Sequence, residues 1–378
     1  MARLDDFGTR PFLAGARAFA VSCSSPELRD TVEALFVDLP CPPSSVDVQK
    51  LNLRESSSLG RNFVELEGAD WPGPSRARAD VALDLLVGAV NQLALEAAPG
   101  LLHLHAGVVA KDGACALLAA RSGTGKSTLT TALVERGWAY LTDETASISP
   151  ESAKVCGFSK PLTIKFNGRR TFPHLSGAAV ALEISERSSW QVPASRIGTL
   201  AGHHEFDPAL ILLLERDDAT SSPRHELIEE ADAVALLMQH ALNVDRFGPA
   251  ALCLAAKLVE RCETYALRVG SPAATASLVQ QLFDSRAIAE PVSTPMMRRP
   301  MSSAVPASVS TAIVGGRAVL HDFESRRVAA LDQTGTEVWM RILEGASMDE
   351  SVDQGKVERF VEELAAEGFI VEEHGGRL

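Results

Sequence analysis

Residues 120–128 read Ala-Arg-Ser-Gly-Thr-Gly-Lys-Ser-Thr, and the chain on either side of them follows two different patterns. Residues 114–120 are continuously apolar, as in a strand that is buried on both faces. From Lys126 to about Arg136 the pattern is helical, and Gly137 is placed to end that helix. A buried strand, a glycine-rich turn and a helix in this order predict an α/β fold, with the turn at the carboxyl end of the strand.

The residues of this turn predict a phosphate-binding loop. They match the pattern GxxxxGK[ST], except that Ala120 stands at the first glycine position. Gly123 and Gly125 let the backbone N–H groups turn inward around phosphate oxygens, and the N-terminus of the next helix adds partial positive charge. Lys126 is expected on the β- and γ-phosphates of ATP, and the Ser127 hydroxyl on Mg²⁺. The predicted nucleotide-binding residues are Ser122, Gly123, Thr124, Gly125, Lys126, Ser127 and Thr128.

An acidic pair, Asp143 and Glu144, follows a predicted strand at residues 139–142. The carboxyl ends of strands in α/β sheets face the ligand crevice. One carboxylate of the pair could hold Mg²⁺, and the other could take a proton from an attacking hydroxyl. An exposed acidic turn without a ligand is the simpler alternative.

The block from His105 to Glu144 resembles the HPr kinase/phosphorylase family and the HprK-related kinases of peptide gene clusters. The resemblance rests on four motifs in order: His105-Ala106-Gly107, Ser122-Gly123-Thr124-Gly125-Lys126-Ser127, Arg136-Gly137 and Asp143-Glu144. It covers about residues 76–284. It implies a P-loop kinase core of HPr kinase type that uses ATP and Mg²⁺.

The same resemblance assigns roles to single residues. It implies that Asp143 is the general base, that Glu144 supports Mg²⁺, and that His105 lies beside the γ-phosphate. Lys160 and Lys165 lie in a segment similar to the Arg/Lys-Pro segment of the HprK-related kinases, so both are candidates to contact phosphate, although solvated strand charges are an equal alternative. The true HPr enzymes carry an acidic metal ligand near this point, and its absence here argues against reverse phosphorolysis.

The C-terminal segment resembles a second family, the PqqD-like domains. The resemblance rests on residues 331–339, Leu-Asp-Gln-Thr-Gly-Thr-Glu-Val-Trp, and on the ending at residues 361–370. It implies a winged-helix domain that captures the leader of a precursor peptide. An extended peptide can add a strand to an exposed sheet edge while a helix groove takes its apolar side chains.

These patterns divide the chain into four parts. Residues 1–75 are expected to form a small α/β region, and residues 76–284 the kinase domain, which opens with a helix at about 76–98. Residues 285–305 are rich in Pro, Ser and Met and are expected to be a flexible linker. Residues 306–378 are expected to form the PqqD-like domain.

The bulk properties exclude several classes of protein. A formal net charge of −13 over 378 residues argues against general nucleic-acid binding. No run of about 18 apolar residues predicts a membrane span, and the N-terminus lacks the apolar core of a signal peptide. The six cysteines are scattered without a CxxC pair, so buried, reduced thiols and a cytoplasmic location are expected. His203-His204, with Glu205 and Asp207, lies in a polar loop and is a weak candidate for a metal cluster.

Together the two resemblances predict a kinase that phosphorylates a Ser or Thr hydroxyl of a ribosomally synthesised precursor peptide. The leader peptide would bind residues 306–378, and the linker would bring the acceptor to the kinase site. Three alternatives stay open: a small-molecule kinase acting on an amino acid or sugar, a nucleotide-sensing scaffold that presents a peptide, and a kinase of HPr itself. HPr kinases are hexamers, so a homo-oligomer is also open.

Overall fold

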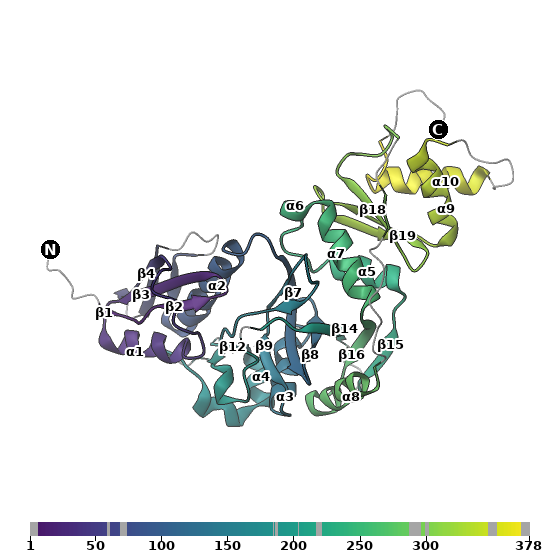
Figure 1. Ribbon diagram of the computed structural model, residues 1–378. Coiled ribbons are helices and arrows are strands. Elements are labelled where there is room, and N and C mark those ends of the chain that lie inside the picture. The colour runs from purple at the N-terminus through teal and green to yellow at the C-terminus, as the bar shows by residue number, and fades with distance from the viewer. Residues whose placement is uncertain are drawn as a thin grey trace.

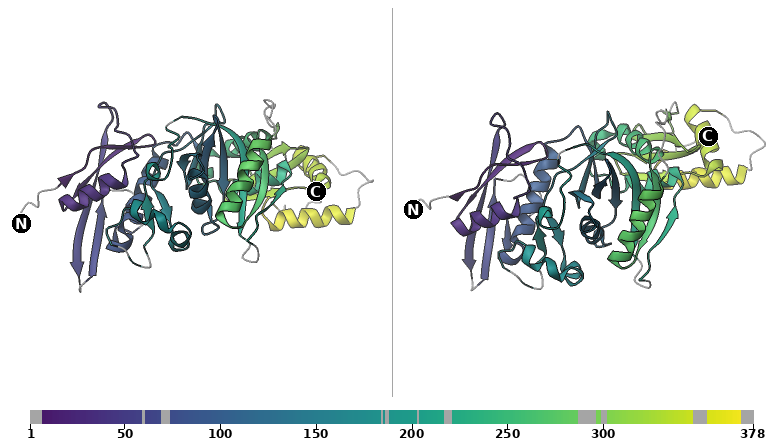
Figure 2. Two further views of the ribbon diagram at one scale, coloured as in Figure 1. Left: turned by 90° about the horizontal axis from the view of Figure 1, so that it is seen from below. Right: turned by 60° about the horizontal axis from the view of Figure 1, so that its bottom comes forward.

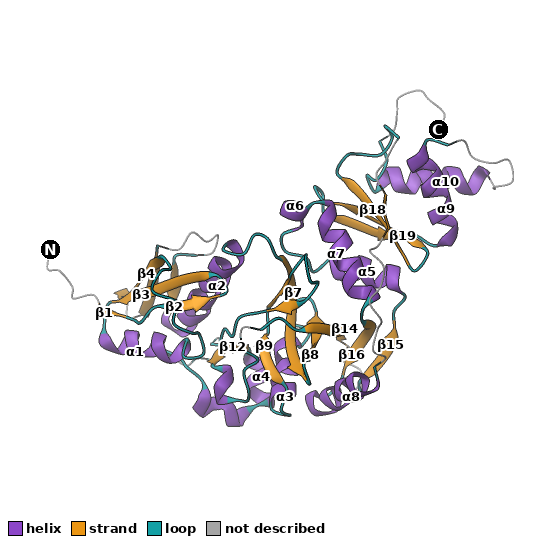
Figure 3. Ribbon diagram, in the orientation of Figure 1, coloured by secondary structure: helices purple, strands orange, loops and turns teal. Residues whose placement is uncertain are grey.

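The computed structural model describes residues 7–58, 61–68, 74–183, 185, 188–202, 204–216, 221–286, 296–298, 302–346 and 354–371. They form a mixed α/β structure, which we divide into a first unit (residues 7–96), a central unit (102–286) and a C-terminal unit (296–371) (Figures 1 and 3). The first and C-terminal units lie at opposite ends of the molecule in every view (Figure 2). Within the described part of the chain, no helix has both the length and the apolar character needed to cross a membrane.

The first unit is a sheet covered by two helices. Its strands run in the order β1-β3-β4-β5-β6, with β2 paired to β3. Helix α1 (Pro26–Leu35) begins after Ser25, whose side chain accepts a hydrogen bond from the Leu28 N–H and so caps the helix. The strands are β1 (Phe7–Gly8), β2 (Phe12–Ala14), β3 (Arg17–Cys23), β4 (Val48–Ser58), β5 (Arg61–Glu67) and β6 (Arg76–Arg78).

Helix α2 (Ala82–Glu96) belongs to this first unit, although the sequence pattern assigned it to the kinase domain. Its buried side chains, Leu86 and Val90 among them, lie in the same apolar core as Phe12 and Phe19 of the first sheet. The expected boundary at residue 75 therefore falls inside a packed unit. Residues 76–78 are also not helical, because β6 pairs with β5, and the helix begins only at Ala82.

The central unit is built on a sheet with the strand order β11-β10-β7-β8-β14-β16-β15, in which β9 also pairs with β7. Strands β8, β14 and β16 are parallel, and the turn Asp112-Gly113 joins β7 to β8 with φ of 51° and 81°. The strands are β7 (Leu102–Lys111), β8 (Ala114–Ala119), β9 (Ala139–Thr142), β10 (Thr145–Ile148), β11 (Val155–Cys156), β14 (Asp207–Arg216), β15 (Arg224–Leu227) and β16 (Glu263–Val269).

Helices cover both faces of this sheet, as the continuously apolar β8 predicts. Leu117 on one face of β8 packs in a core with α5 (Glu230–Met238) and α7 (Pro249–Glu260). Leu118 on the other face packs in a core with α3 (Lys126–Val134) and α8 (Pro272–Ser285). The remaining elements of the central unit are the strand pair β12 (Leu162–Ile164) and β13 (Trp190–Val192), and the short helices α4 (Phe166–Thr171) and α6 (Val244–Phe247).

The C-terminal unit is a four-stranded antiparallel sheet with two helices. The strands β17 (Met296–Arg298), β18 (Val309–Val314), β19 (Arg317–Asp322) and β20 (Arg327–Ala330) are neighbours in that order. Helix α9 (Gln333–Glu344) packs on one face through Trp339, whose indole Nε1 donates to Thr311 Oγ1 at 3.0 Å. Helix α10 (Gln354–Ala366) closes the unit.

The C-terminal unit is docked on the central unit and is not loosely tethered to it. Ala312, Val314 and Val319, on the sheet face opposite α9, share one apolar core with α5 and α7. Arg317 Nη1 lies 2.6 Å from Glu229 Oε2 and 2.7 Å from Asp232 Oδ2 at the start of α5. The apolar face and the ion pairs fix the position of this unit. The expectation that a flexible linker lets the C-terminal unit move toward the glycine loop is therefore wrong.

The expected linker at residues 285–305 is also partly structured. Met296–Arg298 forms β17 and pairs with β18, and Ala304 and Val305 are buried in the core of the C-terminal unit. Residues 287–295 and 299–301 lie outside the described residues. Ser285 still belongs to α8 of the central unit, whereas Met296–Arg298, Ala304 and Val305 belong to the sheet and core of the C-terminal unit.

Candidate active site

The glycine loop, residues 120–127, connects β8 to α3 with the geometry that its glycines allow. Gly123 has φ of 89° and Gly125 has φ of 115°, a left-handed region where a side chain would be strained. Ala120 is 1% exposed, so the departure from the usual glycine puts a small side chain in the core. Helix α3 begins at Lys126, directly after the loop, and its N-terminal N–H groups favour an anion there.

One cavity of about 400 Å³, here called the phosphate cavity, is lined by every residue predicted to act in catalysis or to bind nucleotide or Mg²⁺ except Thr124; of the two candidate phosphate contacts, Lys165 lines it and Lys160 does not. Thr124 lines a neighbouring cavity of about 350 Å³, here called the side cavity. The two cavities share five lining residues: Gly125, Thr128, Asn167, Gly168 and Arg216. The predicted residues in the wall of the phosphate cavity are His105, Ser122, Gly123, Gly125, Lys126, Ser127, Thr128, Asp143 and Glu144.

Lys126 presents a buried ammonium group without a partner. Lys126 is 8% exposed, and its Nζ has no hydrogen-bond partner among the described residues. Burial lowers the pKa of Lys126 from its usual 10.5 to about 8. Gly107 on β7 makes room for this side chain, because a Cβ there would come within 2.9 Å of Thr130 Oγ1 and 3.4 Å of Lys126 Cγ. The glycine of the motif His105-Ala106-Gly107 therefore allows the close approach of α3 to β7.

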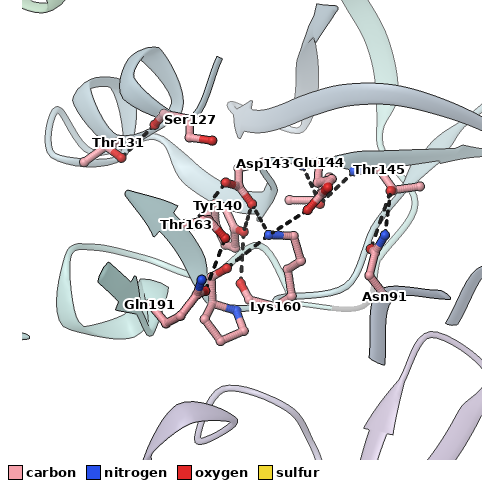
Figure 4. Close-up of polar contacts among 12 residues, drawn as sticks. Asn91, Ser127, Thr131, Tyr140, Asp143, Glu144, Thr145, Lys160, Thr163 and Gln191 are labelled. Carbon is pink, nitrogen blue, oxygen red and sulfur yellow. Dashed lines mark hydrogen bonds and ion pairs between the residues drawn. The ribbon is translucent and has the colours of Figure 1, made fainter. Parts of the chain in front are cut away.

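Asp143 lies in a buried polar network with Lys160 (Figure 4). Lys160 Nζ is 2.5 Å from Asp143 Oδ1 and 3.4 Å from Glu144 Oε2, and the Tyr140 hydroxyl is 3.2 Å from Asp143 Oδ1. The Thr163 N–H donates to Asp143 Oδ2 at 3.3 Å. Lys160 is 1% exposed, so it pairs with the carboxylates and is not placed to meet a phosphate.

The pKa values of this pair follow from opposing effects. Burial by itself raises the pKa of Asp143, but the charge and hydrogen bond of Lys160, together with the Ser127 hydroxyl, lower it below its usual value. Burial by itself lowers the pKa of Lys160, but Asp143 and Glu144 raise it above its usual value. Both groups are therefore charged at neutral pH.

His105 and Glu144 complete the set of predicted catalytic and metal-binding residues in the wall of the cavity. His105 pairs with Thr145 in the register of β7 and β10, and burial and then the charge of Lys126 lower the pKa of its imidazole. The imidazole is therefore neutral at pH 7. The Glu144 side chain is 46% exposed, and it is the more accessible carboxylate of the acidic pair.

Some of the wall comes from residues that the sequence did not single out. Arg216 ends β14, the parallel neighbour of β8, and its Nη1 donates to the Gly123 carbonyl oxygen at 3.4 Å. The meeting of parallel strand ends at one edge is a signal that could have identified it. Lys165, a predicted phosphate contact, donates from Nζ to Ser122 Oγ at 3.2 Å and so lies at the cavity.

The described residues contain no group of three or more His, Cys, Asp or Glu side chains that could hold a metal ion. His203, one of the residues of the weak metal-cluster candidate, lies outside them. All six cysteines are free thiols, but only Cys23 and Cys115 are buried; Cys41 is exposed, and the other three are half-buried. No protein-family model matches this chain, and no curated protein matches it.

Proposed function

We propose that this chain is an ATP-dependent kinase whose phosphoryl donor binds in the phosphate cavity. The observation that carries the proposal is the buried ammonium of Lys126, which has no partner among the described residues. A buried cation without a partner is costly unless an anion joins it. The glycine-loop amides and the N-terminus of α3 favour negative charge at the same place. A triphosphate supplies that charge.

The side cavity supports a nucleotide as the source of the triphosphate. It lies next to the phosphate cavity, shares part of its wall, and measures about 350 Å³. Thr128, which follows the loop lysine and serine, lines both cavities. We therefore assign the phosphate cavity to the triphosphate and the side cavity to the ribose and base.

The oxygen-rich wall of the phosphate cavity fits Mg²⁺. Mg²⁺ keeps several waters and binds substrate phosphates with one or two carboxylates, so it does not need a preformed cluster of protein ligands. The Ser127 side chain forms a hydrogen bond with Asp143, which helps to lower the pKa of that carboxyl. The two side chains therefore lie next to each other, and together they would hold the ion. When bound, the ion would neutralise charge that develops on the phosphoryl oxygens.

The geometry supports a division of roles between the two acids that differs from the one implied by the resemblance. Asp143 has both oxygens engaged and a lowered pKa, which makes it a poor proton acceptor. Glu144 is half-exposed at the cavity, and we propose that it orients the acceptor hydroxyl. Glu144→Gln should then lower kcat about 10²-fold with little change in ATP affinity, while Asp143→Asn should weaken Mg·ATP binding. The reverse pattern in calorimetry and steady-state kinetics would restore Asp143 as the base.

We propose a Ser or Thr hydroxyl of a ribosomally synthesised precursor peptide as the acceptor, and a PqqD-like winged-helix role for the C-terminal unit. This unit offers a small antiparallel sheet with α9 on one face. Strand β20 ends the strand order, so its outer edge has no strand partner among the described residues and is open to an added peptide strand. Docking on α5 and α7 would fix the position of a captured leader relative to the phosphate cavity.

The test is incubation of the full chain with Mg·ATP and the short peptide encoded beside its gene, followed by intact mass measurement. We expect the peptide to gain one phosphoryl group. Removing residues 306–378 would expose the apolar face of α5 and α7, so the leader dependence is better tested on the peptide. A peptide without its leader should lose about tenfold or more in kcat/KM.

Two other outcomes point elsewhere. Binding of ATP without any modification of the peptide would favour a small-molecule acceptor or a scaffold that presents the peptide. Phosphorylation of the peptide with equal efficiency in the absence of its leader would remove the proposed role of the C-terminal unit.

A further inference from the structure

A third cavity lies where the C-terminal unit meets the central unit. It measures about 530 Å³, and we call it the inter-unit pocket. Its walls come from the segment before α5, the end of α7, the start of β16, and the β18–β19 hairpin that carries Gly315 and Arg317 (Figure 1). Because β16 runs parallel to β8, its first residues lie at the end of the sheet opposite the glycine loop.

The walls of this pocket carry an excess of negative charge. They contain four glutamates and two arginines, which leaves two negative charges (4 − 2). Both guanidinium groups are already engaged, since Arg317 pairs with Glu229 and Asp232, and Arg261 Nη1 donates to the Ser152 carbonyl oxygen at 3.0 Å. The four glutamates are Glu229, Glu230, Glu260 and Glu263.

Two hydrogen-bonding atoms in the walls are buried and lack partners. Glu260 Oε2 and Thr264 Oγ1 make no hydrogen bond to any described residue, and Thr264 is 3% exposed. Burial, followed by the charge of Glu230, raises the pKa of Glu260. A carboxylate oxygen and a hydroxyl left in this state cost free energy that a bound donor recovers. The pocket is therefore built to accept hydrogen bonds from a cation.

The size of the pocket and the spread of its acceptors favour an organic cation over a metal ion. The carboxylates of the described residues nowhere form a group of three that could hold a metal. A guanidinium group carries five N–H donors and an ammonium group three, so either can reach acceptors that are apart from one another.

We propose that the inter-unit pocket binds the side chain of an arginine or lysine residue in the precursor peptide. The identity of the peptide rests on the proposed function, whereas the preference of the pocket for a basic side chain does not. From its first to its last residue, the seven-residue strand β16 spans six steps of about 3.3 Å, which is about 20 Å. An extended peptide anchored here needs about seven residues to reach the phosphate cavity, so the acceptor hydroxyl lies at least that far along the chain from the basic anchor.

The pocket is tested on the full chain by titration calorimetry with N-acetyl-arginine amide, and with the neutral N-acetyl-citrulline amide as the control probe. The arginine probe should bind at least tenfold more tightly than the citrulline probe. Glu260→Gln and Thr264→Val should each weaken binding of the arginine probe, Glu260→Gln by about tenfold or more. The matched control Glu67→Gln changes an exposed residue at the end of β5 in the first unit and should leave binding of the arginine probe unchanged.

Equal binding of the two probes, or full affinity in both pocket variants, would overturn the proposal. Free L-arginine binding tenfold more tightly than the capped probe would overturn the peptide as the source of the side chain. Mg·ATP binding is measured on the same samples. A chain that binds the arginine probe but not Mg·ATP would contradict the proposed kinase and support the pocket. A chain that binds Mg·ATP but not the arginine probe would contradict the pocket and leave the proposed kinase unaffected.

Discussion

The phosphate cavity and the inter-unit pocket lie at opposite ends of the same parallel strands, and their unpartnered groups have opposite character. In the phosphate cavity the group is a buried ammonium, that of Lys126. In the inter-unit pocket the groups are a carboxylate oxygen of Glu260 and the hydroxyl of Thr264. We therefore expect an anion to bind at the ammonium end and a cation at the carboxylate end, because a ligand of opposite sign stabilises a buried charge that has no partner.

The pair Lys160–Asp143 shows the contrasting case of a buried charge that already has its partner. Lys160→Met should leave Asp143 charged, buried and unpaired, and should lower the free energy of unfolding by about 3–5 kcal/mol. Combining it with Asp143→Asn should recover more than half of that loss. Urea unfolding of the variants measures both effects. A loss below about 1 kcal/mol in the single variant would mean that the pair is not desolvated as the structure has it.

Lys126→Met tests a buried charge that, unlike that of Lys160, is expected to be paired only when a ligand binds. Because Lys126 has no partner among the described residues, removing its charge should not reduce thermal stability. Peptide phosphorylation should fall by about 10²–10³-fold, since the charge would act on the transferred phosphoryl group. Steady-state kinetics and thermal unfolding check the two parts. Marked destabilisation with normal activity would assign Lys126 to the fold and not to the ligand.

The pH dependence of ATP binding sharpens the same comparison. The pKa of Lys126 is about 8, and a bound triphosphate should raise it. Below pH 8 the ammonium is charged in both the free and the ATP-bound protein, so titration of Lys126 should not change the affinity for ATP with pH. Above pH 8 the free protein loses the proton first, and affinity should fall by up to about tenfold per pH unit. Calorimetry from about pH 7 to about pH 9.5 measures this, and Lys126→Met should abolish the dependence.

The smallest expected effect concerns the ion pairs at the wall of the inter-unit pocket. Arg317→Ala removes contacts to Glu229 and Asp232, whose side chains are 77% and 44% exposed. Solvent screens such pairs, so the loss of unfolding free energy should be at most about 1 kcal/mol. The apolar contacts of Ala312 and Val319 should keep the C-terminal unit docked. Separation of the two units in small-angle scattering of this variant would show that the ion pairs, and not the apolar face, hold them together.

The sequence predicted the features that depend on neighbouring residues. The strand β8, the glycine loop and the start of α3 follow from a short run of side chains, as does the turn at Asp112-Gly113. The acidic pair could be placed because it follows a strand whose carboxyl end faces the loop. Together with the family resemblance, which supplied His105, these local rules put nine of the ten residues predicted for catalysis and for binding of nucleotide and Mg²⁺ in the wall of one cavity.

The features that sequence reasoning missed depend on contacts between distant segments. The apolar pattern of a helix such as α2 does not indicate which sheet the helix packs on, and here α2 packs on the sheet of the first unit. From the sequence we predicted that Lys160 contacts a phosphate, because its ion pair with Asp143 forms only once the chain is folded. The docking of the C-terminal unit did have a signal: β18 and β19 carry apolar side chains on both faces, which predicts burial on both.

The measurement that tests the central claim most directly is equilibrium binding of Mg·ATP to the full chain and to Lys126→Met, by titration calorimetry. The account predicts saturable binding with one site per chain, weakened about tenfold or more in the variant by the loss of a charge-assisted contact to phosphate. Equal affinity of the two proteins for Mg·ATP, or no binding to either, would contradict it.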